Sequence, residues 1–451
     1  MVFAIALVLL VVGSVLFHLL SPWYLTPLAS NWGNIDDTID LTFWVTGIVF
    51  IAVNLFMAWC VIRYKKSDGH TADYEPENQK LEFWLTIFTS LGVAAMLAPG
   101  LLVWSDFVTV PEEATEIEAI GQQWHWSFRL PGVDNKLGTI DSSYITEANP
   151  FGMNPDDPNG QDDFLIASNE LHVPIGTPVK MLLRSNDVLH NFTVTQFRVK
   201  MDLVPGMVTY LWYTPTKVGE YDIMCEEYCG VGHFAMRGRV TVDEDADYQV
   251  WLDDQLTYAE ILAQPVGDPV AGASAYVVCA ACHGAQGEGN PQLNSPKISG
   301  QDGWYMKRQL EYFKSGARGT HEGDIFGKQM IAMAATLIDD AAINNVVAYI
   351  DSLPDVRSAA TVSGDVGRGQ KVYETCAACH GSQGQGRWAL NAPRLSGMTD
   401  WYLVTQLKNF RKGIRGANRK DMYGHQMTML AATLADDQTI DDLAAYINTL
   451  P

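Results

Sequence analysis

The spacing of apolar residues divides the chain into three kinds of segment. Residues 1–104 hold long apolar runs, residues 105–245 hold short ones broken by turns, and residues 271–451 show apolar positions at helical spacing. The runs 41–62 and 83–104 carry no charged residue, and each is long enough to cross a hydrocarbon core of about 30 Å. The pattern predicts a membrane anchor followed by two kinds of extramembrane domain.

A further apolar run, residues 2–20, precedes the two membrane spans. It lacks the basic n-region of a secretory signal, which favours a retained third helix over a cleaved signal peptide. The cluster Arg63-Tyr-Lys-Lys66 lies between the two spans and places their loop in the cytoplasm by the positive-inside rule. We therefore expect a bacterial inner-membrane protein whose later domains lie on the periplasmic or outer side.

Short β-rich runs separated by Gly and Pro fill the region up to residue 242, and such spacing predicts an all-β sandwich or barrel. The runs are Glu116–Ile120, Trp124–Leu130, Phe164–Ala167, Val179–Leu183, Phe192–Val194 and Arg239–Val242. Trp124 and Trp126 alternate within one run and should share a face of its strand. Residues 246–270 have mixed composition and are expected to be a linker.

One stretch of the β-rich segment combines soft metal ligands. Cys225 and Cys229 are followed by His233 and Met236, and His190 could join them from a neighbouring strand. Thiolate and thioether ligands select copper, and imidazole suits it as well. A structural Cys2His2 zinc site is the alternative, although it would leave Met236 without a role.

The motif C-x-x-C-H occurs twice, at Cys279–His283 and Cys376–His380. The thiols of Cys279, Cys282, Cys376 and Cys379 would bind two hemes covalently, with His283 and His380 as iron ligands. The sequence therefore predicts two all-α modules, at residues 271–354 and 355–451. Each ends in an expected helix, Asp339–Leu353 and Asp436–Leu450.

The two modules superpose without a gap at an offset of 97 residues, and this register identifies a second ligand for each iron. Met330 and Met427 are the two methionines that match at this offset, and no histidine outside the attachment motifs matches another. We therefore predict His/Met ligation, which raises a heme potential. A packing role for the two methionines is the alternative.

The formal net charge of −22 argues against nucleic acid as a partner. The excess of acid is concentrated in residues 105–270, whereas the second module holds a basic cluster. The cluster consists of Lys408, Arg411, Lys412, Arg415, Arg419 and Lys420. It is predicted to dock on the acidic copper domain, or alternatively to face an acidic external donor.

The membrane hairpin and the segment to residue 242 resemble subunit II of the heme–copper oxidases. Residues 271–451 resemble tandem class I cytochromes c, as in oxidases that carry their own cytochrome c.

The resemblance implies a cupredoxin-like Greek-key barrel with a dinuclear copper centre, CuA. Its ligands would be His190, Cys225, the Glu227 carbonyl, Cys229, His233 and Met236. It further implies that the Glu227 side chain faces a magnesium ion at a subunit boundary. Trp124 would receive electrons, and Glu82 would lie at the mouth of a proton channel.

The expected function is that of subunit II of a terminal cytochrome c oxidase, a proton-pumping translocase (EC 7.1.1.9). Two c-type hemes would pass electrons to CuA and on to subunit I, with no complete catalytic site on this chain. The other partners implied are further oxidase subunits and a donor such as a quinol:cytochrome c reductase or a soluble cytochrome c. A nitric oxide reductase subunit and a free-standing membrane electron carrier are the alternatives.

Overall fold

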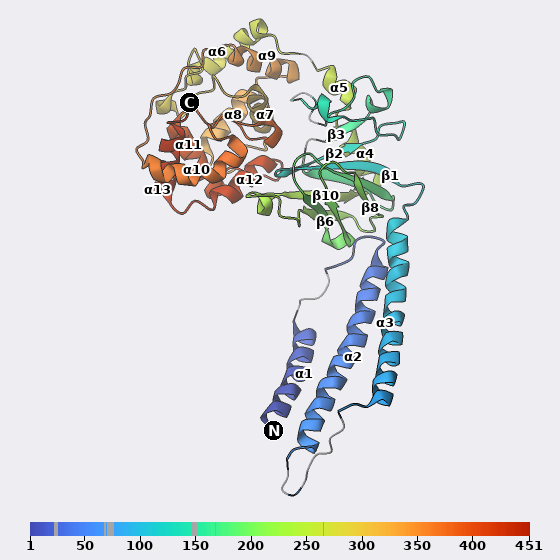
Figure 1. Ribbon diagram of the computed structural model, residues 1–451. Helices are drawn as coiled ribbons and strands as arrows, with labels where there is room; N and C mark the ends of the chain where they lie inside the picture. Colours follow the sequence, from blue (N-terminus) through green and yellow to red (C-terminus); the bar gives the residue numbers. More distant parts are fainter. Residues whose placement is uncertain are drawn as a thin grey trace.

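The structure is a computed structural model of the 451-residue chain, and it describes residues 1–21, 26–66, 69, 76–146, 149, 151–166, 168–264 and 266–451. Three long helices lie below a β-domain, and a helical region lies beside that domain (Figure 1). Ala167, the predicted end of one strand, lies outside the described residues. The arrangement confirms the predicted fold class of membrane helices, β-domain and two helical modules.

The membrane helices are α1 (Val2–Leu20), α2 (Gly33–Arg63) and α3 (Gln79–Val108). All three are long and apolar enough to cross a membrane, and most of their large apolar side chains are exposed on the isolated chain. Exposed apolar surface of this extent is expected where lipid, not water, surrounds a helix. Whether α1 is retained in the mature protein stays a prediction.

The start of α2 lies well before the predicted residue 41 because its first turns pack under the β-domain. Asp36 accepts a hydrogen bond from Nε of Arg198 at 2.7 Å. Trp32, just before the helix, is buried, and its Nε1 donates to the carbonyl oxygen of Trp212 at 2.9 Å. The hairpin is therefore joined to the β-domain by direct contacts as well as by the chain.

The β-domain consists of two five-stranded sheets packed face to face. One has the order β3 (Phe164–Ile166), β2 (His125–Leu130), β1 (Thr115–Gln122), β5 (Val179–Ser185) and β8 (Thr209–Tyr213). The other has the order β4 (Glu170–Pro174), β10 (Arg237–Asp243), β9 (Gly219–Met224), β6 (His190–Val194) and β7 (Val199–Leu203). Two sheets whose apolar faces meet form the core of a β-sandwich.

The residues expected to form a linker contain two helices, α4 (Asp245–Asp253) and α5 (Tyr258–Leu262). Trp251 of α4 stacks on the ring of His172, with 4.5 Å between ring centroids. Tyr258 is buried in a small core beside Ile120. These helices hold the link between the β-domain and the first module against the β-domain surface.

Each helical module contains four helices in the same order. The first has α6 (Pro269–His283), α7 (Gly303–Lys314), α8 (Ile325–Ala334) and α9 (Asp340–Asp351). The second has α10 (Val366–His380), α11 (Asp400–Arg411), α12 (Met422–Ala431) and α13 (Asp437–Ile447). The first and last helices cross closely at matched glycines. A Cβ on Gly272 would clash with the Asn345 carbonyl, and one on Gly369 would clash with the Asp442 carbonyl.

Candidate copper and heme sites

The side chains predicted to bind copper converge at one end of the β-domain. The sulfur atoms of Cys225 and Cys229 lie 3.7 Å apart, and both residues are buried. Cys225 Sγ lies 3.9 Å from Nδ1 of His190. Cys229 Sγ lies 3.4 Å from Nδ1 of His233 and 3.8 Å from Sδ of Met236. The structure thus brings together the five predicted side-chain ligands, with His190, His233 and Met236 around the pair of thiols.

The strands and loops explain why these ligands meet. His190 begins β6, the cysteines follow β9, and His233 opens a short 3-10 helix, η4 (His233–Ala235), before β10. Because β6, β9 and β10 are neighbours in one sheet, their ends present these groups to one place. Ligands on adjacent strand ends are held in a fixed geometry.

Asp187 orients His190 and was not singled out in the sequence. Its Oδ1 lies 2.8 Å from Nε2 of His190, which leaves Nδ1 of that ring toward the sulfur pair. A carboxylate on the far nitrogen of a ligating imidazole is a common feature of metal sites. The signal was its position three residues before His190, although that spacing alone carries little information.

Hydrogen bonding favours ionisation of one thiol of the pair, Cys225, whereas the hydrogen bond to Cys225 and burial hold the pKa of Cys229 well above its usual range. A hydrogen bond from the Cys229 thiol lowers the pKa of Cys225 to about 3, although burial opposes this shift. The carbonyl of Glu227 lies 3.2 Å from Cys225 Sγ, as the predicted ligand set requires. A buried, readily formed thiolate with imidazole, thioether and carbonyl groups around it fits copper better than zinc.

Trp124 lies in the two-residue turn between β1 and β2, where Gln122 pairs with His125. The prediction that Trp124 and Trp126 share a strand face is wrong because only Trp126 lies in the strand. Nε1 of Trp124 donates to the carbonyl of Cys229 at 3.1 Å. The turn therefore places this indole directly on the backbone of a predicted copper ligand.

Glu227 and Glu82 are placed but not assigned a role by the structure. The side chain of Glu227 is half-buried beside the copper ligands. Glu82 lies in the first turn of α3, where its Oε1 accepts from the backbone N–H of Asn78 at 3.4 Å. This contact satisfies a backbone N–H at the start of α3. The magnesium role of Glu227 and the proton-path role of Glu82 stay predictions.

Both attachment motifs end a helix and direct their histidine toward a cavity. Nδ1 of His283 donates to the carbonyl of Pro296 at 2.8 Å, and Nδ1 of His380 donates to that of Pro393 at 2.7 Å. The other ring nitrogen of each histidine, Nε2, then carries the lone pair that can bind iron. Burial lowers the pKa of each imidazole, although the hydrogen bond to the proline carbonyl opposes it. Neutral imidazole is the form that binds iron.

The methionines predicted as second ligands line the same cavities as these histidines. Met330 lines the first cavity with His283, and Met427 lines the second with His380. Met333 also lines the first cavity, so the cavity lining does not select between Met330 and Met333. The assignment of Met330 and Met427 continues to rest on the 97-residue register, and it stays a prediction.

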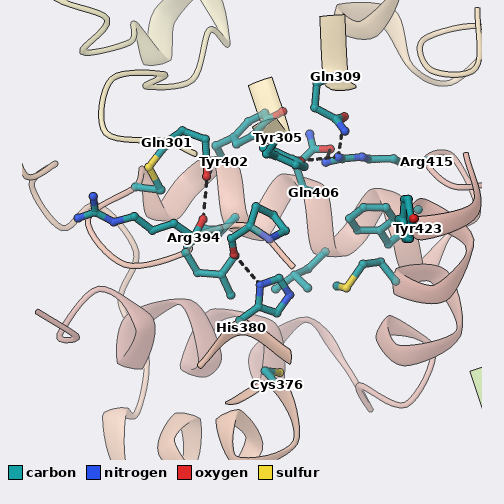
Figure 2. A pocket seen from close by; sticks show the side chains of 18 of the residues that line it. Gln301, Tyr305, Gln309, Cys376, His380, Arg394, Tyr402, Gln406, Arg415 and Tyr423 are labelled. Carbon is teal, nitrogen blue, oxygen red and sulfur yellow. Dashed lines mark hydrogen bonds between the residues drawn. The ribbon is translucent and has the colours of Figure 1, made fainter. Parts of the chain in front are cut away.

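A polar network between the modules was missed in the sequence, although it repeats at the same offset. Figure 2 shows Arg415, Gln406, Tyr305 and Gln309 around the second cavity. Arg415 donates to Tyr305 Oη at 2.8 Å and to Gln309 Oε1 at 3.1 Å. The matched residue Arg318 donates to Tyr402 Oη at 2.9 Å and to Gln406 Oε1 at 3.3 Å.

The two arginines are buried and hydrogen-bonded to neutral groups. Tyr305, Gln309, Tyr402 and Gln406 line both cavities, so the cavities adjoin at this network. Asp421 lines the second cavity with Arg415 and Asp324 lines the first with Arg318, yet Nε of each arginine has no hydrogen-bond partner among the described residues. A buried cation that is not fully compensated is costly. The propionate groups of heme are anions of suitable chemistry, which supports a heme in each cavity.

The second module docks on the β-domain at Trp124, where α12 meets η4 (Figure 1). Nε2 of Gln426 donates to the carbonyl of Trp124 at 2.5 Å, and the backbone N–H of Asn169 donates to Met422 Sδ at 3.1 Å. Ala378 and Cys379, from the heme-attachment motif, pack against the β-domain core. The attachment face of the second module therefore lies against the copper end of the β-domain.

The prediction that the basic cluster docks on the β-domain is largely wrong. Arg419 does pair with Glu220 of the β-domain at 2.6 Å. Lys408 and Arg411, however, pair with Asp437 of their own module, and Arg415 is buried toward the first module. Burial lowers the pKa of His125 at this interface to about 4, although nearby Asp187 opposes the shift. The interface is therefore held mainly by neutral groups.

We expect electron transfer across this interface to depend little on salt. Among the described residues, Arg419–Glu220 is the exposed ion pair across this interface, and it contributes about 1 kcal/mol or less. Neutral contacts are not screened by salt. Raising the ionic strength of the assembled protein should change the transfer rate by less than about twofold. Time-resolved absorbance after photoreduction measures this, and a steep fall with salt would contradict it.

The comparisons with known proteins agree with both sites. Residues 115–242 match the family described as cytochrome C oxidase subunit II, periplasmic domain, and residues 269–354 and 366–451 match the cytochrome c family. The chain is 59% identical over 259 residues to the alternative cytochrome c oxidase subunit 2 of Bradyrhizobium diazoefficiens. That alignment covers 57% of this chain and 94% of the relative.

More distant relatives match shorter parts. The cytochrome c oxidase subunit 2 of Cereibacter sphaeroides is 27% identical over 226 residues, covering 46% of this chain and 72% of the relative. The solved structure of reduced cytochrome c4 from Pseudomonas stutzeri is 28% identical, covers 41% of this chain and 100% of its own, and has a TM-score of 0.34.

Proposed function

Because the chain belongs to the cytochrome c oxidase subunit 2 family, we propose that it relays electrons from two covalently bound hemes through CuA to the oxygen-reducing subunit. It is a component of a heme–copper oxidase, extended by cytochrome c domains, with apolar helices that suit a membrane anchor. The proposal includes two hemes, a coupled proton pump, and residence in a bacterial inner membrane with the copper and heme domains outside.

The observation that carries the relay is the contact between a heme-attachment motif and the copper end of the β-domain. Cys379 packs against the β-domain core in which Cys229 is also buried, and Trp124 lies at the same boundary. Electron transfer slows steeply with distance, so direct packing of the two sites favours a rapid intramolecular step. The chemistry that hemes and CuA supply when bound is one-electron oxidation and reduction.

The chain's own residues position these groups. His190, His233 and Met236 surround the thiol pair, and Asp187 fixes the orientation of the His190 ring. His283 and His380 are held by proline carbonyls with Nε2 available to iron. Trp124 links the two sites because its ring nitrogen binds the Cys229 carbonyl and its own carbonyl binds Gln426.

We expect Trp124→Phe to slow heme-to-copper transfer while copper stays bound. The change keeps an aromatic ring and removes the hydrogen bond to Cys229, so a fall on the order of fivefold or more, equivalent to about 1 kcal/mol, is expected. The matched control is Trp126→Phe, because Trp126 Nε1 has no hydrogen-bond partner among the described residues. The measurement is transient absorbance of heme and CuA after photoreduction of the assembled oxidase.

Two outcomes would count against the proposal. If photoreduced heme never reduces copper in the unaltered protein, the relay is wrong. If both variants transfer electrons at the unaltered rate, Trp124 has no part in the relay. Copper content measured on each sample separates slow transfer from loss of the site.

A further inference from the structure

The face of the second module that contacts the β-domain has a matching face on the first module at the offset of 97 residues. In the second module this face includes Cys379, Leu390, Met422, Tyr423 and Gln426, all of them half-buried. The matching residues of the first module are Cys282, Leu293, Ile325, Phe326 and Gln329; all of them are exposed, and all but Ile325 also line the mouth of the first cavity. We call these five first-module residues the open face.

The exposure of the open face is not a property of the module fold, because the same positions are covered in the second copy. Ile325 is 64% exposed and Phe326 is 43% exposed, although both are large and apolar. Their counterparts Met422 and Tyr423 contact Asn169 and His125 of the β-domain. A repeated apolar face that is covered in one copy and open in the other indicates a partner for the open copy.

We propose that the open face receives a soluble electron-donor protein, a redox protein with an apolar contact patch and a basic rim. This proposal rests on the relay proposed above. It places the point where electrons arrive on the first module, and it orders the path as first heme, second heme and then copper. Cys282, one of the two heme-attachment thiols of the first module, is exposed within this face.

Charge defines the chemistry of this partner. Arg419 of the second module pairs with the acidic Glu220 of the β-domain, and its counterpart in the first module is Glu322. The charge at this position is therefore negative in the first module and positive in the second. A negative charge there favours a partner that presents a cation. Exposed Glu288 adds negative charge near the attachment motif, whereas exposed Lys328 offsets part of it. A donor rimmed by lysine residues fits this face.

The alternative landing place for such a donor, the indole at the copper site, is covered. Trp124 is 6% exposed, and its carbonyl is hydrogen-bonded to Gln426 of the second module. A soluble donor could reach this indole only by displacing the second module. The attached modules therefore move the donor site from the copper domain to the first module.

The test uses the assembled oxidase and a reduced mitochondrial-type cytochrome c, whose heme edge is ringed by lysine residues, as the probe. Glu322→Lys and Ile325→Glu should each lower the second-order rate of heme reduction by about tenfold at low salt, and Ile325 does not line the first cavity. For Glu322→Lys the loss should shrink as salt is raised. Val270→Glu is the matched control, since Val270 is 81% exposed on the same module and its counterpart Gly367 is exposed as well.

Each result supports or overturns the proposal. Unchanged rates in both variants, or an equal loss in Val270→Glu, would overturn it. A slower second-order step in Trp124→Phe would also overturn it, because that result places the donor on the copper domain. If Ile325→Glu converts a dimer of the chain to a monomer in sedimentation, the open face binds a second copy instead, which overturns the proposal.

Failure of the relay would be seen separately. Photoreduction of heme in the same samples measures the intramolecular step to copper without any donor. A normal intramolecular step with unaffected donor rates removes only the open-face proposal. Loss of the intramolecular step in the unaltered protein removes the relay itself.

Discussion

Replacing Met427 with leucine is expected to lower the midpoint potential of one heme by a substantial part of the roughly 0.8 V range that axial ligands span. The same effect is expected on the other heme for Met330→Leu. Both methionines line the cavity of their attached histidine, and thioether ligation raises a heme potential. The loss of thioether ligation should also abolish the near-infrared charge-transfer band of the ferric heme.

The matched control for these variants is Met333→Leu. Met333 lines the first cavity beside Met330 and carries the same side chain, but its counterpart in the second module is Leu430. Spectroelectrochemical titration should show an unchanged potential in this control. If Met333→Leu instead lowers the potential and Met330→Leu does not, the register argument has selected the wrong methionine.

The second large effect is expected for Cys229→Ser. Cys229 lies within 3.4–3.8 Å of the predicted ligand atoms of Cys225, His233 and Met236, so its thiolate is the centre of the site. A serine hydroxyl is a poor ligand for copper compared with a thiolate. We expect loss of the mixed-valence CuA signal in electron paramagnetic resonance and no electron transfer beyond the hemes.

Cys60→Ser provides the matched control for Cys229→Ser. Cys60 lies in α2 and belongs to none of the three cysteine pairs. Its replacement should leave copper content, heme reduction and oxygen consumption unchanged. In Cys229→Ser the hemes should still be reduced by a donor, which separates loss of copper from loss of folding. Retention of a normal CuA signal in that variant would contradict the assigned ligand set.

The sequence was sufficient for the elements whose signal is local. The spans, the C-x-x-C-H motifs and the cysteine-rich loop depend on residues close together in the chain, and the structure places them as expected. Strands β4, β7, β8 and β9 were not predicted. In β4, β7 and β9 polar and apolar residues are mixed, and β4 becomes a strand by pairing with β10, which is distant in sequence. The aromatic run of β8 is typical of a strand and could have been recognised.

The relation between the domains was predicted less well because charge counts do not specify contacts. Lys408 and Arg411 form ion pairs with Asp437 of their own module. The net charge of each segment does not show such a pairing within one module. Arg415 is buried, although an arginine that belongs to a cluster of basic residues is expected at the surface. The 97-residue offset that pairs Met330 with Met427 also pairs Arg318 with Arg415. A search for basic residues that match at this offset would have indicated the polar network between the modules.

Among the described residues, Arg419–Glu220 is the exposed ion pair at the boundary between the second module and the β-domain, so this boundary depends on the covalent link between its two sides. A tethered module experiences an effective concentration of its partner in the millimolar range when the connecting segment is short. Helices α4 and α5 hold the start of the connection against the β-domain, and the first module, which is hydrogen-bonded to the second, forms the rest of it. Contacts that would be too weak to assemble two separate proteins can therefore keep this boundary closed.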